Sequence, residues 1–223
     1  MLENTLIQTE PLTLFPLGCV LLPGGVLPLR IFEARYNDMV RECMRNDLAF
    51  GVCRITKGNE VGVQAEYEPI GCAAKITDFD TEQPGILRIR AIGQKVFKVV
   101  SANVDQQGLV RAQVVYSEPE ADAAVPAEYA FCQEALTQII AQVDQAQEHF
   151  EKPYDFASAA WVSHRLTEVL PLSGESKQLL LQMQAPLERL KLLNQVLLQH
   201  SMASGLDQES EDTAPPGGSS RSH

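Results

Sequence analysis

Residues 12–36 read LTLFPLGCVLLPGGVLPLRIFEARY, and this stretch decides the fold. Two apolar runs are separated by Pro23-Gly24-Gly25, which marks a tight turn because glycine tolerates conformations that other residues avoid. The second run passes directly into a charged segment whose apolar residues recur at helical spacing. The predicted order is strand, turn, strand and helix. The stretch has few polar groups able to do chemistry, so it indicates architecture rather than activity.

The charged segment, Glu33–Asn46, predicts an amphipathic helix that ends at Asn46-Asp47. Its apolar residues fall on one helical face, which we expect to be buried: Tyr36, Met39, Val40, Cys43 and Met44.

Short β-prone runs follow the helix. They cover residues 48–55, 60–66, 70–79, 86–92, 96–104 and 109–116, with a turn expected at Gly93. In residues 86–92, Arg88 and Arg90 alternate with apolar residues, which is typical of a sheet with one face in water. Many short strands at close spacing favour a closed or nearly closed barrel.

The following region is rich in helical patterns. Apolar residues from Tyr129 to Phe150 predict one helix of about 25 residues, on their spacing of about 3.5 residues. Asp155 is the expected N-cap of a second helix, Ser173 of a third, and Pro186 opens a fourth. Four helices with short connections predict a small bundle. We therefore divide the chain into a β-rich part, residues 1–118, a helical part, residues 119–203, and an acidic tail, residues 204–223, that we expect to be disordered.

Bulk properties narrow the class of protein. The net charge of −11 argues against a protein that binds nucleic acid through a basic surface. The five cysteines are dispersed and form no CxxC pair, so neither a zinc site nor a disulfide framework is predicted. The N-terminus lacks the basic start of a secretory signal, and no run is long enough to span a membrane. We expect a cytoplasmic protein with no membrane partner.

A search for chemistry-bearing motifs predicts no catalytic residue, no metal site and no cofactor. His164 and Glu168 lie four apart on a predicted helix and are expected to share a surface hydrogen bond rather than hold a metal. Ser173 and Lys177 have the spacing of a dyad, but a cap and a solvated lysine explain them better. Asp78 and Asp80 are expected to be solvated acids next to a turn.

The opening stretch resembles the start of the Lon protease N-terminal (LON substrate-binding) domain family. The matching residues are Leu14, Phe15, Pro16, Leu17, Pro23, Gly24, Pro28, Leu29, Ile31, Phe32, Glu33, Arg35 and Tyr36, supported by Phe50-Gly51, Gly62, Ile70-Gly71, Ala91-Ile92-Gly93, Val96-Phe97-Lys98, Leu170-Pro171-Leu172 and Leu187-Glu188-Arg189-Leu190. The resemblance covers about residues 10–200. It implies an α+β fold, with a PUA-like β pseudo-barrel followed by a C-terminal α-helical bundle.

The resemblance also implies a function: a free-standing, non-catalytic protein- or peptide-binding module, with neither the ATPase nor the peptidase of full-length Lon proteases. Its expected partners are unfolded or exposed protein segments and a protease system. We expect the binding residues where the second strand meets the first helix, at Arg30, Phe32, Glu33, Arg35 and Tyr36. For each of these residues alone, a structural role is the stronger interpretation.

Two other functions stay open. PUA-like barrels can bind RNA, and Arg88, Arg90 and Arg111 can lie on one sheet face with Lys95 and Lys98 nearby; the net charge and the aromatic content of 6% argue against this. A cleft between barrel and bundle can also hold a small molecule or an enzyme site. The sequence names no client or ligand and no oligomeric state.

Overall fold

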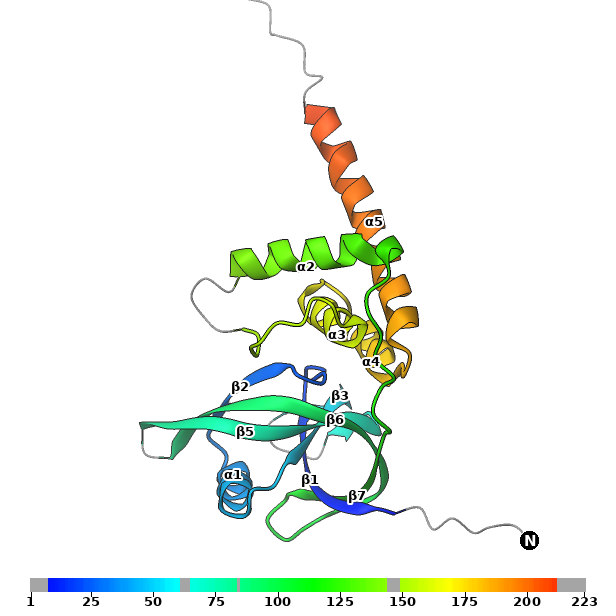
Figure 1. The fold of residues 1–223 in the computed structure, drawn as a ribbon. Coiled ribbons are helices and arrows are strands. Elements are labelled where there is room, and N and C mark those ends of the chain that lie inside the picture. Colours follow the sequence, from blue (N-terminus) through cyan, green and yellow to red (C-terminus); the bar gives the residue numbers. More distant parts are fainter. Residues whose placement is uncertain (1–7, 61–64, 84, 144–148, 212–223) are drawn as a thin grey trace, which may run out of the picture.

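The computed structural model describes residues 8–60, 65–83, 85–143 and 149–211 (Figure 1). Within these residues the protein is a sheet-rich mixed fold of seven strands and five α-helices. The strands are β1 (Glu10–Leu17), β2 (Val26–Ile31), β3 (Phe50–Lys57), β4 (Glu66–Tyr67), β5 (Ile70–Gln83), β6 (Ile86–Val104) and β7 (Val110–Tyr116). The helices are α1 (Ala34–Asn46), α2 (Ala130–Val143), α3 (Ala159–Val169), α4 (Gly174–Gln182) and α5 (Pro186–Glu211), and a short 3-10 turn at Ala127–Tyr129 precedes α2.

The sheet runs in the order β1-β7-β6-β5-β3-β4, and β1 also pairs in parallel with β3. The path therefore returns from β3 to its first strand. β2 lies outside it, and among the described strands it pairs with the first half of β6 alone, so it is an edge strand, where Pro28 costs no ladder hydrogen bond. Figure 1 shows α1 on one side of the sheet and α2 to α5 on the other.

The predicted strand–turn–strand–helix order is confirmed. Gly24 has a φ of 71°, in the left-handed region that favours glycine. The predicted helix face is buried at Tyr36, Met39, Val40 and Cys43, but the prediction for Met44 is wrong, because that side chain is 38% exposed at the edge of the face.

Gly93 does not form the predicted turn, because β6 runs through it without a break. It pairs instead with the Pro-Gly-Gly turn: Gly24 donates to the carbonyl of Gly93, and Gly93 donates to the carbonyl of Gly25. A Cβ at Gly93 would lie 2.1 Å from the carbonyl oxygen of Leu22. Glycine is therefore required here by the close approach of two backbones.

Helix boundaries also differ from the prediction. α2 ends at Val143, and Phe150 lies beyond it, where it forms an isolated bridge with Gly25. Residues 144–148 lie outside the described part of the chain. The N-cap of α3 is Ser158 rather than Asp155, since the Ser158 hydroxyl accepts from the backbone N–H of Trp161.

Two further predictions concern segments next to residues that the structure does not describe. Most of the strand predicted at residues 60–66 lies outside the described residues, and β4 begins at Glu66. α5 opens at Pro186 as predicted and continues to Glu211, into the segment expected to be a tail. No helix in the described ranges combines the length and apolar character needed to cross a bilayer.

Two large apolar clusters lie on either side of the sheet. One joins α1 to the inner faces of β2, β5 and β6, and the other is formed by helices α2 to α5. A small cluster of Leu22, Val96 and Leu181 joins the sheet to α4. This apolar contact is small. Polar contacts also join the sheet to the helices, among them those of Arg165 with the Pro-Gly-Gly turn and of Arg90 with Glu151.

Candidate binding groove

The outer face of β2, β6 and β5 forms the floor of a groove. Across these three strands Pro28 stands opposite Arg90 and Arg90 opposite Asp78. In the next row Arg30 stands opposite Arg88, which stands opposite Asp80. Alternate residues such as Leu27 and Ile89 point to the other face and pack against α1, because successive side chains on a strand alternate.

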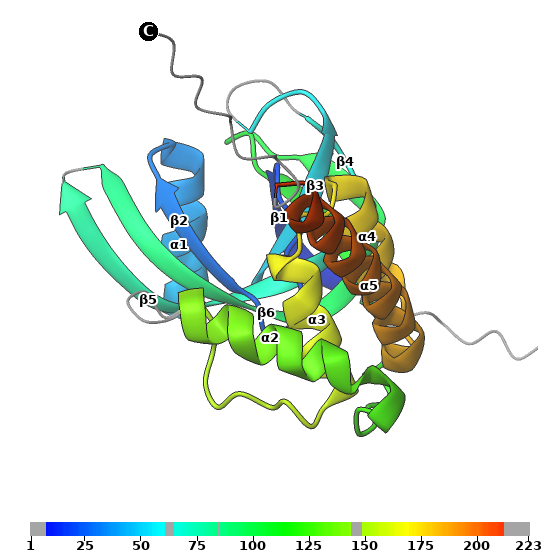
Figure 2. The same cartoon turned by 90° about the horizontal axis from the view of Figure 1, so that it is seen from above.

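The groove has a volume of about 980 Å³. His149 forms part of its wall, and the Arg90 guanidinium lies 2.9 Å from the Glu151 carboxylate, so the segment after α2 closes one side. Figure 2 shows the end of the β5–β6 hairpin, with β2 alongside, reaching past the helices that cover the rest of the sheet. The floor therefore presents charges of both signs on an accessible surface.

A cleft of about 370 Å³ adjoins the groove, and the two share Val26 and His149. The cleft lies between the segment before the turn and the ends of α2 and α3. Its lining is mainly apolar: Val20, Leu21, Val26, Leu27, Val143, Phe150 and Val169, with Cys19, His149, Glu168 and Lys177.

The residues predicted from the sequence to bind fall into two sets. Arg30 and Phe32 lie on the surface, and Phe32 is 57% exposed. Arg30 lines the groove, and both residues line a small pocket of about 60 Å³ beside it. They are the members of the set that an external ligand can reach.

The other three predicted residues build the junction between β2 and α1. The Tyr36 ring is buried and stacks on Phe15 with 3.9 Å between ring centroids. The Arg35 guanidinium lies 4.6 Å from the Tyr36 ring centroid and 2.9 Å from the Glu33 carboxylate, and it donates to the carbonyl of Gly108. These contacts fix the direction in which the chain leaves β2.

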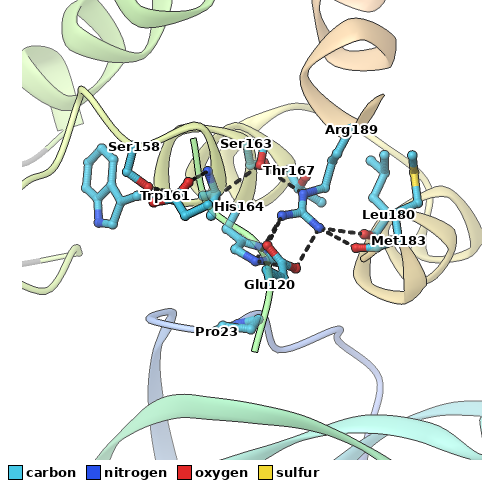
Figure 3. A network of polar contacts seen from close by, with 12 residues as sticks. Pro23, Glu120, Ser158, Trp161, Ser163, His164, Thr167, Leu180, Met183 and Arg189 are labelled. Carbon is cyan, nitrogen blue, oxygen red and sulfur yellow. Dashed lines mark hydrogen bonds and ion pairs between the residues drawn. The ribbon is translucent and has the colours of Figure 1, made fainter. Parts of the chain in front are cut away.

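A polar cluster lies between helices α3 and α5 and consists of the buried residues Ser163, His164 and Arg189 with the part-buried Glu120 (Figure 3). Arg189 is fully buried; it lies 2.6 Å from one Glu120 oxygen and donates to the Ser163 hydroxyl. The His164 Nε2 lies 3.2 Å from the other Glu120 oxygen. The predicted surface contact between His164 and Glu168 is therefore wrong, because the His164 side chain is buried between α3 and α5, against Glu120 and Arg189.

The charges of the cluster are balanced by its own members, since the Arg189 guanidinium pairs with the Glu120 carboxylate. Burial raises the pKa of Glu120, but hydrogen bonds from His164 and Arg189 outweigh it and lower the pKa to about 2. Burial lowers the pKa of His164 to about 4, against the opposing contact with Glu120. At neutral pH the cluster therefore holds one ion pair and a neutral imidazole, which is an arrangement suited to holding helices together.

A second polar contact joins α3 to the Pro-Gly-Gly turn. Arg165 is only 1% exposed; its guanidinium donates to the carbonyls of Pro23 and Gly24 and lies 2.9 Å from the Glu168 carboxylate. A Cβ at Gly25 would meet that carboxylate at 2.2 Å. Main-chain atoms of the turn thus provide the joint between the two parts.

The predictions for Ser173 and Lys177 have different outcomes. Ser173 caps α4 as expected, accepting from the backbone N–H of Ser176. Lys177 is not simply solvated, because it donates to the carbonyl of Glu168 at 2.7 Å. Burial raises the pKa of Glu168 to about 7, although Arg165 and Lys177 lower it.

The arrangement of arginines bears on the RNA alternative. Arg111 lies on β7, where it bonds Asp105, Glu42 and Thr13, so carboxylates already neutralise it. On the groove floor, Asp78 and Asp80 stand across from Arg90 and Arg88. These carboxylates repel phosphate and argue against a nucleic-acid surface.

Two sets of residues were not predicted from the sequence. Asp78 and Asp80 form part of the groove floor, and their two-residue spacing on a strand is the signal that could have placed them on the face of Arg88 and Arg90. The polar contacts of Arg165 and Arg189 left no such local signal. In the described ranges, no group of three or more histidine, cysteine, aspartate or glutamate residues could hold a metal ion.

Comparison with known proteins identifies the family. The family model of the ATP-dependent protease La (LON) substrate-binding domain matches residues 11–199. This match covers most of the chain, and the protein therefore belongs to the LON substrate-binding domain family.

Solved structures and a curated relative agree with this membership. A Lon N-terminal domain protein from Xanthomonas campestris is 36% identical, with a TM-score of 0.68, and the match covers 82% of this chain and 96% of that one. The N-terminal domain of a Mycobacterium avium complex Lon protease shares the fold, with a TM-score of 0.56 at 13% identity over 82% of this chain and 96% of that one. Chicken (Gallus gallus) cereblon is 31% identical over 98 residues, which are 43% of this chain but only 21% of cereblon.

Proposed function

We propose that this protein is a non-catalytic module that binds exposed or unfolded segments of other proteins along the β2–β6–β5 groove. The observation that carries the proposal is the groove itself, an open recess of about 980 Å³ whose floor presents charges of both signs. An extended chain offers backbone amides and mixed side chains, which such a floor can accept. Membership of a substrate-binding family supports the same conclusion.

We assign the β-rich part, residues 1–118, to a PUA-like pseudo-barrel, residues 119–203 to a helical bundle and residues 204–223 to a tail, into which α5 continues as far as Glu211. The parallel pairing of β1 with β3 supports the first assignment, because it returns the strand path to its start. The apolar cluster shared by α2 to α5 supports the second.

Roles for the five residues predicted from the sequence follow from their positions. Arg30 and Phe32 contact the bound segment, since they lie on the accessible surface beside the groove. Glu33, Arg35 and Tyr36 position them by fixing the β2–α1 junction. The module needs no cofactor for this role. Its clients are segments destined for a protease system in the cytoplasm.

The test is a binding assay with fluorescently labelled α-lactalbumin that has been reduced and carboxymethylated, so that it stays unfolded. Fluorescence anisotropy should report a saturable complex at low salt with the unfolded protein and none with native α-lactalbumin. The absence of any complex at micromolar concentrations of the module would refute the proposal.

A matched pair of variants locates the site. Arg30→Ala should weaken binding by about 5-fold, the loss expected for about 1 kcal/mol of contact energy. Arg41→Ala makes the same change at an exposed position on α1, where Arg41 pairs with Asp38, and should leave binding unchanged. Equal effects from both variants would show that overall charge, rather than the groove, is responsible.

A further inference from the structure

The cleft beside the groove differs from it in chemistry. The groove floor carries five charged side chains from its strands, whereas apolar residues from both parts of the chain line most of the cleft. Leu21, Leu27 and Phe150 are buried and form its fixed base, while Val20, Val26 and Val169 are partly accessible. A volume of about 370 Å³ gives room for a large side chain with part of its backbone.

The charged groups at the cleft are already engaged with the protein itself. The Glu168 carboxylate pairs with Arg165, and the Lys177 ammonium donates to the carbonyl of Glu168. The Glu168 charge is therefore already paired, and apolar side chains make up most of the surface that a ligand meets in the cleft. Burial of apolar surface is the main source of binding energy that the cleft offers.

The cleft and the groove form one continuous recess. Val26, the first residue of β2, and His149 line both of them. A chain lying along β2 in the groove reaches the mouth of the cleft at Val26. This continuity makes a side chain of the groove-bound segment the natural occupant of the cleft.

We propose that the cleft is an anchor pocket, which takes one large apolar side chain, such as leucine, methionine or phenylalanine, from the segment bound in the groove. This inference rests on the proposed function and deepens it. The groove accepts the chain with little selectivity, and the cleft selects segments that carry an exposed apolar residue. Such residues are buried in folded proteins, so the pocket distinguishes unfolded from folded clients.

Cys19 provides a direct probe of the cleft. It lies on the cleft lining and is exposed, whereas Cys43, Cys53, Cys72 and Cys132 are buried. Burial raises the pKa of all five thiols, Cys19 included, so selectivity comes from exposure: the reagent reaches Cys19 and does not reach the four buried thiols. Mild treatment with N-ethylmaleimide therefore labels Cys19 selectively and leaves an adduct in the cleft of the folded protein.

The first experiment uses the tightest-binding peptide from an overlapping set that covers α-lactalbumin. Each large apolar residue of that peptide is replaced in turn by alanine. One replacement should weaken binding by about 10-fold or more, as expected when a leucine-sized side chain loses its burial, while the others change little. The parent peptide should also slow alkylation of Cys19, and the weakened peptide, at equal occupancy of the module, should not.

The second experiment blocks the cleft. The maleimide adduct should weaken the parent peptide by the same factor as the critical alanine replacement, and it should leave the alanine peptide unaffected. Cys19→Ser, treated with the same reagent, is the matched control and should bind both peptides as the untreated protein does. The adduct requires no refolding, so a folding defect cannot explain the loss.

Several outcomes would overturn the inference. If every alanine peptide binds as the parent does, the groove function stands and the anchor pocket is wrong. If no peptide binds, the proposed function fails and the anchor pocket fails with it. If N-acetyl-leucine amide alone protects Cys19 as strongly as the parent peptide does, the cleft is a site for free small molecules rather than for clients.

Discussion

The groove floor and the buried polar cluster use the same residue types in opposite ways. In the cluster, Arg189 is surrounded by Glu120, Ser163 and backbone carbonyls, and its charge is fully committed to the helices. On the floor, Arg88 lies exposed between Arg30 and Asp80 across the strands. What surrounds an arginine therefore decides whether its charge is used within the fold or stays available to a ligand, and mutation can test this division.

The largest effect is expected at Arg189. Arg189→Ala removes the fully buried guanidinium that pairs with the part-buried Glu120 carboxylate and leaves that carboxylate with His164 alone, which should lower the free energy of unfolding by about 4 kcal/mol. Urea unfolding followed by circular dichroism measures this. Arg88→Ala is the matched control and should change the free energy of unfolding by less than about 0.5 kcal/mol. Similar losses for the two variants would contradict the division.

The next effect concerns the joint between β6 and the turn. Gly93→Ala places a Cβ against the backbone carbonyl of Leu22, which cannot move without disturbing the turn. We expect a loss of about 3 kcal/mol of unfolding free energy, near the upper end for overpacking. Gly85→Ala is a useful comparison, because nothing lies near its Cβ, although its φ of 86° adds local strain. A smaller loss at position 93 than at position 85 would argue against the close contact.

A pH-dependent effect is expected at Glu168. The pKa of Glu168 in the folded protein is raised to about 7 from an ordinary 4.5, so folding favours the protonated carboxyl. Its stabilising contribution is therefore fully present below about pH 4.5 and is lost as the pH rises through about 7. Glu168→Gln removes this dependence. The stability of the variant relative to wild type should therefore be greater at about pH 8 than at about pH 5, by about 2 kcal/mol.

Urea unfolding of both proteins at the two pH values measures the difference. His164 titrates in both proteins, so its own contribution cancels. A relative stability that does not change with pH would show that Glu168 stays ionised in the folded state.

The smallest effect on stability should be accompanied by an effect on binding. Arg88→Ala leaves the fold intact but should weaken the complex with unfolded α-lactalbumin by about 5-fold at low salt. The difference should shrink as salt rises, because exposed charges are screened. Anisotropy titrations at two salt concentrations check this. An unchanged affinity would remove Arg88 from the binding surface.

Sequence patterns predicted the local structure and missed the long-range contacts. The alternation in residues 86–92 predicted the wet face that became the groove floor, and helical spacing predicted most of the buried face of α1. The continuous strand through Gly93 was missed because its cause is a backbone more than sixty residues away. Arg165 and Arg189 lie on amphipathic helices, where nothing local distinguishes a buried arginine from a solvated one.

The candidate site was predicted only in part. Arg30 and Phe32 lie on the accessible surface, but the other residues of the groove around Arg30 come largely from β5, β6 and the segment after α2. Pairing between β2 and β6 joins positions about sixty residues apart, and sequence periodicity does not reveal which strands become neighbours. A site assembled by strand order is therefore less predictable than one carried by a single element.

The joint at the Pro-Gly-Gly turn has a consequence for engineering. Arg165 holds carbonyl oxygens, and every amino acid supplies those, so the contact depends on the path of the turn and not on its side chains. Exchange of the helical part between related proteins should therefore preserve this contact, provided that an arginine occupies the position of Arg165 and the glycines are retained. Chimeras joined at the Pro-Gly-Gly turn would then show whether selectivity for client segments moves with the helical part.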